Sequence, residues 1–257
     1  MTREKWEAIR RLALGLSHGM LSAGAETYRI EETAERVLRA YGAENIDIFA
    51  IANYLSISFE SPEGEEFFAQ RRVPSRSDNL DHIIKLNDLT RRICKTTPEP
   101  GQALSEVREI MSSRASEKLY TQVLITGYVG FGFALMIGAG LWGALYAFVI
   151  DVILKLCIFP LQKLQVNRLF VNIIGGFIVT ILTAFTGYFG LGHLRTVITA
   201  GSFMYLFPGI SLMNSIRDLI SNDTIAGLSK LLETLLAALS IAIGSGLALG
   251  VERLVLR

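Results

Sequence analysis

Charged side chains are distributed very unevenly along this chain of 257 residues. Residues 1–118 carry 36 of the 49 Asp, Glu, Lys and Arg side chains, whereas residues 119–251 carry only 10. Such a charge-poor stretch suits a lipid bilayer better than water. We therefore expect an α-helical polytopic membrane protein with about five transmembrane helices in residues 119–257. It would be preceded by a soluble α+β domain in residues 1–118.

Five apolar segments in the membrane part are each close to the roughly 20 residues that a helix needs to cross a bilayer. They comprise residues 120–139, 141–160, 169–190, 196–215 and 225–250. Almost nothing separates the first two segments, so the turn at GAGLW has to be tight. Glycines in the first and third segments, such as Gly130 and Gly176, would let neighbouring helices approach closely.

The soluble part shows both helical and strand periodicity. Apolar residues recur at helical steps in residues 2–20, 26–41 and 79–94, and a last helix is expected before residue 118. Apolar and other residues alternate in Ile46–Ala52, Tyr54–Glu60 and Glu66–Val73, a pattern typical of strands with one buried face. SPEG, before the third strand, is good hairpin chemistry. We expect a small antiparallel sheet among these helices, large enough to bury a core of its own.

One membrane segment is interrupted by helix-breaking residues. In SFMYLFPGISLMNSIRDLISND (residues 202–223), Pro208 and Gly209 stand inside the apolar run. Proline lacks an amide hydrogen and glycine adopts unusual dihedrals, so this pair frees backbone polar groups. In hydrocarbon such groups are tolerated only where protein or a water-filled cavity satisfies them. We expect a discontinuous membrane helix lining an internal site, with a polar stripe formed by Ser211, Asn214, Arg217 and Asp218.

Charge inside the other membrane segments is sparse and therefore informative. Asp151 and Lys155 are four residues apart in the second segment, so they face the same way and can pair. They could belong to a transport pathway or form a structural ion pair between helices, and the sequence favours neither. Asn172 in the third segment is a weaker candidate, because it could simply hydrogen-bond between helices.

Several classes of function are excluded or disfavoured. Basic and acidic residues are interleaved in the first part, which argues against a nucleic-acid partner. We find no phosphate-binding loop, no GxSxG, no HExxH and no Cys/His cluster, so we expect no enzyme, no metal and no cofactor. Cys94 and Cys157 lack the spacing of a disulfide framework or a redox motif.

The orientation can be argued from the basic residues beside the apolar segments. If five helices alternate in direction, one side of the membrane collects Lys118, Lys163, Arg168, Arg217 and Lys230. The positive-inside rule makes that side the cytoplasm. We therefore expect a multi-pass protein of the plasma (inner) membrane with a cytoplasmic N-terminal domain.

A second unusual stretch lies between the first two helices. In SAGAETYRIEE, the residues Ser22, Gly24 and Thr27 interrupt the apolar pattern, and Arg29 and Glu31 belong to a crowd of charges. By physical chemistry alone, a helix–helix turn with a capping serine and solvated ion pairs is favoured over a ligand site.

Two stretches together resemble the threonine/serine exporter family: LSAGAETYRIEETAERVLRAYGA and LFPGISLMNSIRDLISNDTIAG. The resemblance covers nearly the whole chain. The matching positions are Ser22, Gly24, Ala25, Thr27, Arg29 and Glu31 in the first stretch, and Pro208, Gly209, Leu212, Asn214, Ile216, Arg217, Asp218 and Gly227 in the second.

The resemblance implies a transport subunit and a partner. Longer members of the family carry a second membrane portion, whereas split members make the two portions as separate chains. This sequence resembles the larger subunit of the split form, which implies a small four- or five-span membrane partner. Five spans would also leave a fused second half inverted, a common design of secondary transporters.

We expect the export of small polar carboxylated metabolites, driven by a proton or sodium gradient. Ser211 and Asn214 would hydrogen-bond the cargo, Arg217 would attract its carboxylate, and Asp218 would orient Arg217 or respond to a proton. Threonine/serine-type amino acids are the leading cargo and a C4-dicarboxylate such as succinate is the alternative. A hypothesis of another class makes residues 1–118 a membrane-anchored sensor or regulatory domain.

Overall fold

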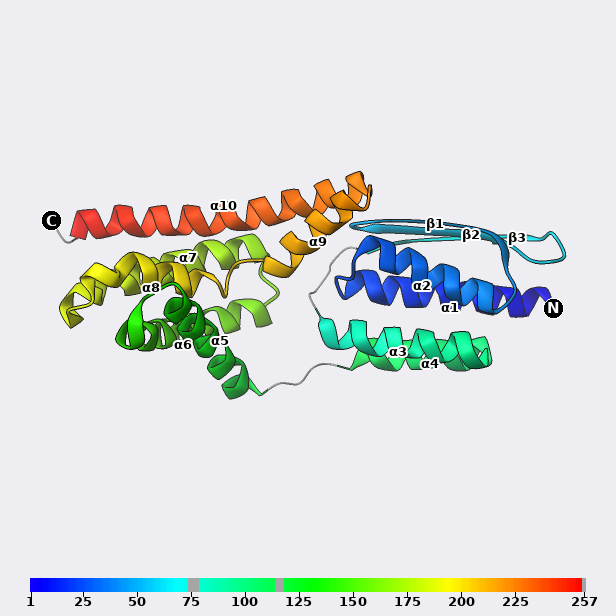
Figure 1. The fold of residues 1–257 in the computed structure, drawn as a ribbon, viewed down its shortest axis with the longest axis horizontal. Coiled ribbons are helices and arrows are strands. Elements are labelled where there is room, and N and C mark those ends of the chain that lie inside the picture. The colour runs from blue at the N-terminus through cyan, green and yellow to red at the C-terminus, as the bar shows by residue number, and fades with distance from the viewer. Residues whose placement is uncertain (74–78, 114–117, 256–257) are drawn as a thin grey trace. The chain divides into compact units, whose positions relative to one another are not determined.

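The computed structural model describes residues 1–73, 79–113 and 118–255 (Figure 1). The chain divides into two compact units. The first comprises Met1–Ala115 together with Gly209–Leu232, and the second comprises Ser116–Pro208 together with Glu233–Arg257. Residues 209–232, which we expected in the membrane part, thus pack in the first unit.

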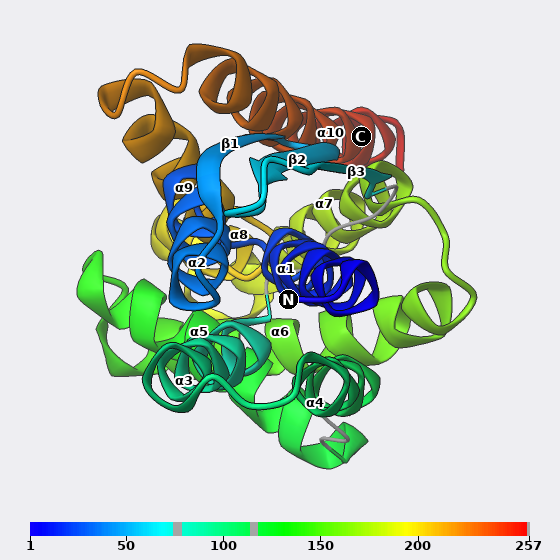
Figure 2. The same cartoon turned by 90° about the vertical axis from the view of Figure 1, so that its right-hand side faces the viewer.

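The first unit is built around helix α1. Its elements are α1 (Arg3–Ser22), α2 (Thr27–Ala40), β1 (Glu44–Ile51), β2 (Tyr54–Glu60), β3 (Glu66–Arg72), α3 (Leu80–Thr96), α4 (Pro100–Ser112), α9 (Gly209–Ile220) and the first turns of α10 (Thr224–Val255). Helix α1 contacts α2, α3, α4 and the sheet, and Figure 2 shows it end-on between the sheet and α3/α4. Trp6, Ile9, Leu12 and Leu16 are almost completely buried on it, as the predicted helical spacing requires.

The three strands form an antiparallel sheet in the order β1-β2-β3. Leu55, Ile57 and Phe59 alternate toward the core and are nearly inaccessible, whereas the residues between them are partly exposed. The strands lie within two residues of the ranges predicted from this alternation. The hairpin between β2 and β3 closes through a hydrogen bond from the Ser61 amide to the Glu65 carbonyl (2.9 Å), and Gly64 there has a φ of 80°.

The second unit is helical. It contains α5 (Leu119–Met136), α6 (Gly140–Lys163), α7 (Arg168–Ala184), the 3₁₀ turns η1 (Phe185–Phe189) and η2 (Gly192–Leu194), α8 (Arg195–Phe203) and the remainder of α10. The turn between α5 and α6 is as tight as expected. Gly138 and Gly140 both have positive φ there, and the Ala139 amide donates to the Ala134 carbonyl (2.9 Å).

Four helices among the described residues are long and apolar enough to cross a membrane: Leu119–Met136, Gly140–Lys163, Arg168–Phe189 and Thr224–Leu254. The fifth expected segment, residues 196–215, is not one helix. Helix α8 ends at Phe203 and α9 begins at Gly209, so the predicted break at Pro208-Gly209 is confirmed. A fifth crossing made of these two short helices, and the inverted second half that would follow from it, stay predictions.

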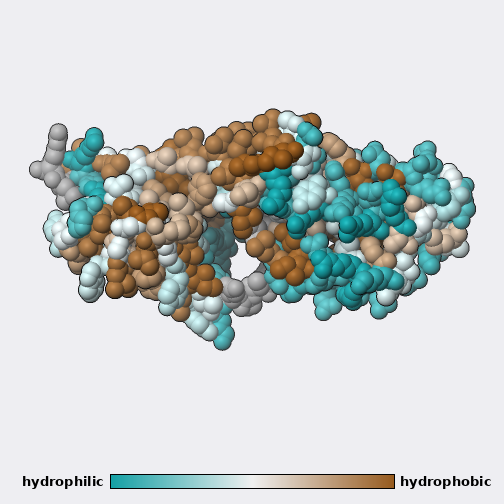
Figure 3. Space-filling model, viewed as in Figure 1, coloured by the Kyte–Doolittle hydropathy of each residue, from teal (hydrophilic) through white to brown (hydrophobic). Residues whose placement is uncertain are grey.

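Large apolar side chains cover the outside of these four helices. Figure 3 shows apolar surface over α7 and α10 and hydrophilic surface over the N-terminal elements. Examples from three helices are Trp142 (74% exposed), Phe170 (62%) and Leu235 (56%). An apolar exterior of this extent matches lipid rather than water, so the chain has the surface of a multi-pass membrane protein.

Helices α7 and α10 approach each other through glycines. A Cβ atom on Gly176 would lie 2.4 Å from the carbonyl oxygen of Ile241, and a Cβ on Gly244 would lie 1.9 Å from the carbonyl oxygen of Ile173. These distances leave no room for any side chain. Packing of small residues is the main means by which membrane helices associate, so this predicted role of Gly176 is confirmed.

The substitution Gly244→Ala should therefore destabilise the second unit. The added methyl group must push α7 and α10 apart, which should cost about 1–3 kcal/mol. Thermal unfolding of the full chain in a mild detergent measures this loss. Gly246→Ala is the matched control, because a Cβ there meets nothing within 4 Å, and equal effects of the two substitutions would contradict the packing.

Candidate functional site

The first of the two family-like stretches forms the turn between α1 and α2. Helix α1 ends at a glycine: Gly24 has a φ of 86°, its amide donates to the Leu21 carbonyl, and the Ala25 amide donates to the Met20 carbonyl. These two backbone hydrogen bonds cap the C-terminus of the helix, and the pattern needs a residue with positive φ. Glu26, not the expected serine, occupies the N-cap position of α2, and its side chain makes no cap hydrogen bond.

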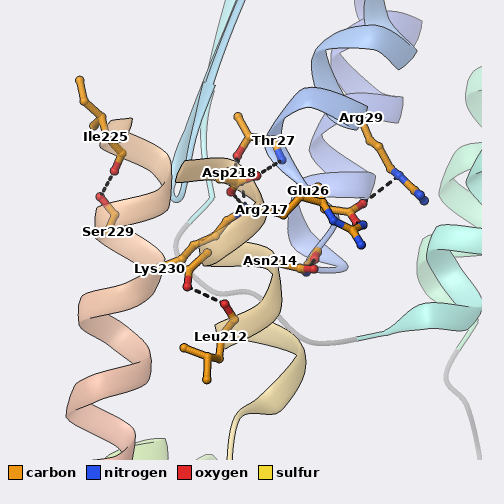
Figure 4. Close-up of polar contacts among 12 residues, drawn as sticks. Glu26, Thr27, Arg29, Leu212, Asn214, Arg217, Asp218, Ile225, Ser229 and Lys230 are labelled. Atoms are coloured by element: carbon orange, nitrogen blue, oxygen red, sulfur yellow. Dashed lines mark hydrogen bonds and ion pairs between the residues drawn. The ribbon is translucent and has the colours of Figure 1, made fainter. Parts of the chain in front are cut away.

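The second stretch forms α9, which contacts this turn directly. The Asn214 side-chain amide donates to the Gly24 carbonyl at 3.1 Å. The two stretches are 190 residues apart in sequence and belong to the same compact unit. The structure therefore brings both together into one contact, which we call the motif junction: Gly24, Glu26, Thr27, Arg29, Asn214, Arg217, Asp218 and Lys230 (Figure 4).

A buried ion pair lies at the centre of the motif junction. The Lys230 Nζ lies 2.6 Å from the Asp218 Oδ2, and the side chains are 5% and 0% exposed. The Thr27 hydroxyl donates to the same Oδ2 (3.1 Å), and the Thr27 amide donates to Oδ1 (3.3 Å). Asp218 thus supplies from α9 the acceptor that the N-terminus of α2 lacks.

A second, more open cluster lies beside it. Glu26 forms ion pairs with Arg217 and with Arg29, the latter at 2.9 Å. The Glu26 side chain is only 10% exposed, whereas Arg217 is 47% and Arg29 43% exposed. Because water reaches both guanidinium groups, each pair contributes little to stability.

The arrangement differs from the expectation that Asp218 orients Arg217. The two neighbours point to different partners, Asp218 to Lys230 and Arg217 to Glu26, because adjacent residues on a helix do not share a face. Of the other predicted residues, Ser22 ends α1, Ser211 lies in the first turn of α9, and Pro208 directly precedes it.

The turn from α9 to α10 is also determined by its backbone. Asn222 has a φ of 67°, and the Asp223 amide donates to the Asp218 carbonyl (2.9 Å). A Cβ on Gly227 would lie 2.9 Å from the Leu219 amide nitrogen, so only glycine lets α10 approach α9 this closely. This approach brings Lys230 within reach of Asp218.

Two further carboxyl groups lie close to the buried pair. Burial raises the pKa of Glu31 above its usual 4.5, and the negative charges of Asp223, Asp218 and Asp47 raise it further. The Ala50 amide donates to its Oε1 at 3.0 Å and opposes this effect. Burial, followed by the charge of Asp218, also raises the pKa of Asp223.

In the second unit, the predicted pair of Asp151 and Lys155 does not form. The Lys155 Nζ donates instead to the Gln162 Oε1 (3.1 Å) and to the Tyr205 hydroxyl (3.0 Å). The spacing puts both residues on one face, but the long lysine side chain extends along α6, away from Asp151. Of the two alternatives that the sequence left open, the structural ion pair is therefore not formed, and a pathway role stays a prediction.

Asp151 is fully buried and lies against the backbone of Gly130. A Cβ on that glycine would lie 2.1 Å from the Asp151 Oδ2. Among the described residues, neither carboxylate oxygen makes a hydrogen bond of good geometry, and the same is true of the Asn172 side-chain nitrogen. The buried Ser202 hydroxyl lies near enough to interact with the Asp151 carboxylate. Unpaired polar groups in an apolar bundle are costly to stability, so they are strong functional candidates.

The second unit contains a cavity of about 310 Å³ that the sequence did not reveal. It lies between α7, α8 and α10, and hydroxyl groups and one arginine dominate its polar lining. The lining residues are Thr180, Thr183, Arg195, Thr196, Thr199, Ala200, Phe203, Ser245 and Leu249. The sequence feature that indicates this cavity is a pair of threonines three residues apart on each of α7 and α8. This spacing puts the two threonines of each pair on the same helix face.

The arginine of this cavity has an acidic partner. The Arg195 Nη1 and Nη2 donate to the two Glu252 carboxylate oxygens at 2.7 and 2.5 Å. Their side chains are 31% and 17% exposed. This bidentate ion pair places a cation and an anion side by side. We call the cavity with this lining the hydroxyl cavity; Glu252 is not part of the lining but pairs with its arginine.

Comparison with known proteins decides the family. The family model described as "Putative threonine/serine exporter" matches residues 11–251. This chain belongs to the threonine/serine exporter family. The match includes both sequence stretches that form the motif junction, so the resemblance seen in the sequence is confirmed.

Two curated relatives from this family are each 26% identical to the chain. One is the "Threonine/serine exporter" of Corynebacterium glutamicum, aligned over 94% of this chain and 50% of its own length. The other is the "Probable threonine/serine exporter" of Mycobacterium tuberculosis, aligned over 91% of this chain and 44% of its own length. The chain thus spans about half the length of these relatives. No solved structure matches it.

Removing one partner of the buried pair should strongly destabilise the first unit. Asp218→Ala leaves Lys230 buried without its counter-charge and should cost about 3–5 kcal/mol in the free energy of unfolding. Arg217→Ala, which removes a half-exposed partner, should cost about 0–1 kcal/mol. Denaturant unfolding of the full chain measures both.

The double variant Asp218→Ala/Lys230→Met is the control for this prediction. It removes both charges, so it should recover much of the loss seen in the single variant. A double variant as unstable as Asp218→Ala alone would contradict a direct ion pair.

Glu31 should make the stability of the first unit depend on pH. Because its pKa is raised in the folded state, its contribution to stability is present below the unfolded value of 4.5 and is lost as pH rises through the folded value. Glu31→Gln should therefore flatten the fall in stability above pH 4.5. Glu32→Gln, an exposed neighbour on α2, should leave the profile unchanged, and identical profiles for Glu31→Gln and wild type would contradict the assignment.

Proposed function

We propose that this chain forms part of a secondary transporter that exports small polar carboxylated metabolites, with threonine/serine-type amino acids as the cargo. The hydroxyl cavity carries this proposal. Its volume of about 310 Å³ lies at the lower end of the range for small-molecule sites. It lies between two candidate membrane-spanning helices and the short α8, where polar side chains usually mark a substrate pathway.

The chemistry of the hydroxyl cavity favours an amino acid over a dicarboxylate. An amino acid carries a carboxylate, which Arg195 would bind, and an ammonium group, which Glu252 would bind. The Thr180, Thr183 and Thr199 hydroxyls already donate within the protein, to the Ser245 hydroxyl and to the Thr180 and Arg195 carbonyls. Their oxygens can still accept a hydrogen bond from a cargo hydroxyl. A dicarboxylate would need a second cation, and Arg195 is the sole cation in the described lining. The names of the two relatives also mention threonine and serine.

Asp151 is our candidate for the coupling step. A transporter without a phosphate-binding loop must take its energy from an ion gradient. A buried carboxylate that no described cation pairs with, and that has only the Ser202 hydroxyl beside it, can exchange a proton, or bind sodium, when the helices around it move. Lys155 and Asn172 remain pathway candidates beside it.

The residues that the sequence suggested for cargo binding have a different role in this proposal. Asn214, Arg217 and Asp218 already bind the α1–α2 turn and α10, so we propose that the motif junction holds α9 to the N-terminal domain. Movement of that domain could then be transmitted to α9 and to the break before it. Pro208 and Gly209 would be the hinge.

A complete pathway would require a second membrane portion. The relatives are about twice the length of the aligned region, which supports a further portion of the transporter beyond these residues. We predict that this further portion is a separate small subunit with four or five membrane spans. We also predict that the N-terminal domain lies in the cytoplasm and that the protein lies in the plasma membrane.

Transport in vesicles tests the proposal. Vesicles containing this chain and its second membrane portion would be loaded with labelled threonine, serine or succinate under an imposed proton or sodium gradient. Arg195→Gln and Glu252→Gln should each reduce threonine flux at least about tenfold, because a charged hydrogen bond to cargo is lost. Arg253→Gln, the exposed neighbour of Glu252, should transport normally.

The exchanged pair separates cargo binding from a structural role. Arg195→Glu combined with Glu252→Arg can rebuild the ion pair but reverses the charges offered to cargo. Stability should return to normal while threonine flux stays low. Restored flux would mean that the pair is structural, and succinate flux greater than threonine flux would contradict the amino-acid assignment.

A further inference from the structure

A second cavity, of about 340 Å³, lies within the first unit. It is bounded by α1, β3 and α4 and is separate from both the motif junction and the hydroxyl cavity. Arginines and apolar side chains share its lining: Arg11, Leu14, Gly15, His18, Arg71, Leu104, Val107, Arg108 and Met111. Each of the three elements contributes one arginine.

The three arginines have no acidic partner among the described residues. Arg11 donates through Nε to the Glu7 carbonyl oxygen at 3.2 Å, and the Glu7 carboxylate is taken by Arg10 at 2.6 Å. Arg71 and Arg108 form no ion pair within residues 1–73, 79–113 and 118–255. Three guanidinium groups around one concave surface repel each other and attract an anion.

The position of Arg71 follows from the register of β3. Phe67 and Ala69 point to the buried face of the sheet, and Arg71, two residues further, pairs with the fully buried Leu55. Alternation along a strand therefore directs Arg71 toward α1, and the next residue, Arg72, toward the opposite face.

His18 adds a hydrogen-bonding group without a charge. Burial lowers the pKa of His18, and the positive charge of Arg71 lowers it further. Both effects favour the neutral ring, and the arginines supply the positive charge. The remaining wall is apolar, with Val107 buried and Leu14, Leu104 and Met111 partly buried.

We propose that this cavity, which we call the arginine cavity, binds a small organic anion with a carboxylate head and a short apolar tail. The guanidinium groups fit the carboxylate, because arginine binds it through two parallel hydrogen bonds. The leucine, valine and methionine side chains fit the tail. The described lining residues include no carboxylate. An amino acid would leave its ammonium group unpaired there, so the ligand is not the proposed cargo.

Calorimetric titration of the full chain in lipid nanodiscs tests this site. Hexanoate is the probe, hexanamide has the same shape without the charge, and acetate has the charge without the tail. Hexanoate should bind saturably, at one site, and at least about tenfold more tightly than either comparison compound. Hexanoate binding no tighter than that of hexanamide, or no saturable binding, would overturn the proposal.

Variants locate the binding within the cavity. Arg71→Gln and Arg108→Gln should each weaken hexanoate binding about tenfold, with an unchanged unfolding temperature because both side chains are exposed. Arg72→Gln is the matched control, since it removes the same charge from the opposite face of β3, and it should bind normally. Equal weakening by Arg72→Gln would show a general charge effect and would refute the site. The two test variants lie on different elements, so misfolding of one leaves the other decisive.

Discussion

The buried ion pair between Asp218 and Lys230 is the interaction on which the first unit depends. Burying two charges is favourable only when their geometry is good and their remaining hydrogen bonds are satisfied. Thr27 meets this condition, because its hydroxyl and amide both bind the Asp218 carboxylate. One aspartate thus connects the start of α2, the end of α9 and the start of α10. Residues 209–232 consequently pack with the N-terminal domain, although long apolar segments separate them from it in the sequence.

The residues that carry the family resemblance divide into two kinds. Gly24 and Gly227 shape the backbone, one through positive φ and the other through a close approach of helices. Asn214, Arg217 and Asp218 then bind across the contact that these glycines permit. In our proposal, the groups that bind cargo lie elsewhere, in the hydroxyl cavity. In the same proposal, the motif junction holds α9 and the start of α10 to the N-terminal domain, and cargo passes beside Arg195 and Glu252.

Local patterns predicted most of the elements, because apolar periodicity reports which face of a helix or strand is buried. The strand ranges, the α5–α6 turn and the break at Pro208-Gly209 all follow from residues within a short window. Contacts between residues far apart in sequence cannot be predicted from such local patterns. For example, no residue near Thr27 indicates that its partner is Asp218. Spacing also misled us at Asp151 and Lys155, where a shared helix face did not imply contact. The hydroxyl cavity was missed because threonines are common packing residues in membrane helices.

Amide hydrogen exchange at the start of α2 tests the central claim, that Asp218 stabilises this helix from α9. The measurement compares wild type and Asp218→Ala at peptide resolution in the full chain. We predict that exchange in residues 24–30 becomes at least about tenfold faster in the variant. The reason is that the Thr27 amide and hydroxyl lose the Asp218 carboxylate that accepts their hydrogen bonds. Exchange in α3 should change much less. Unchanged protection of residues 24–30 in Asp218→Ala would contradict the motif junction.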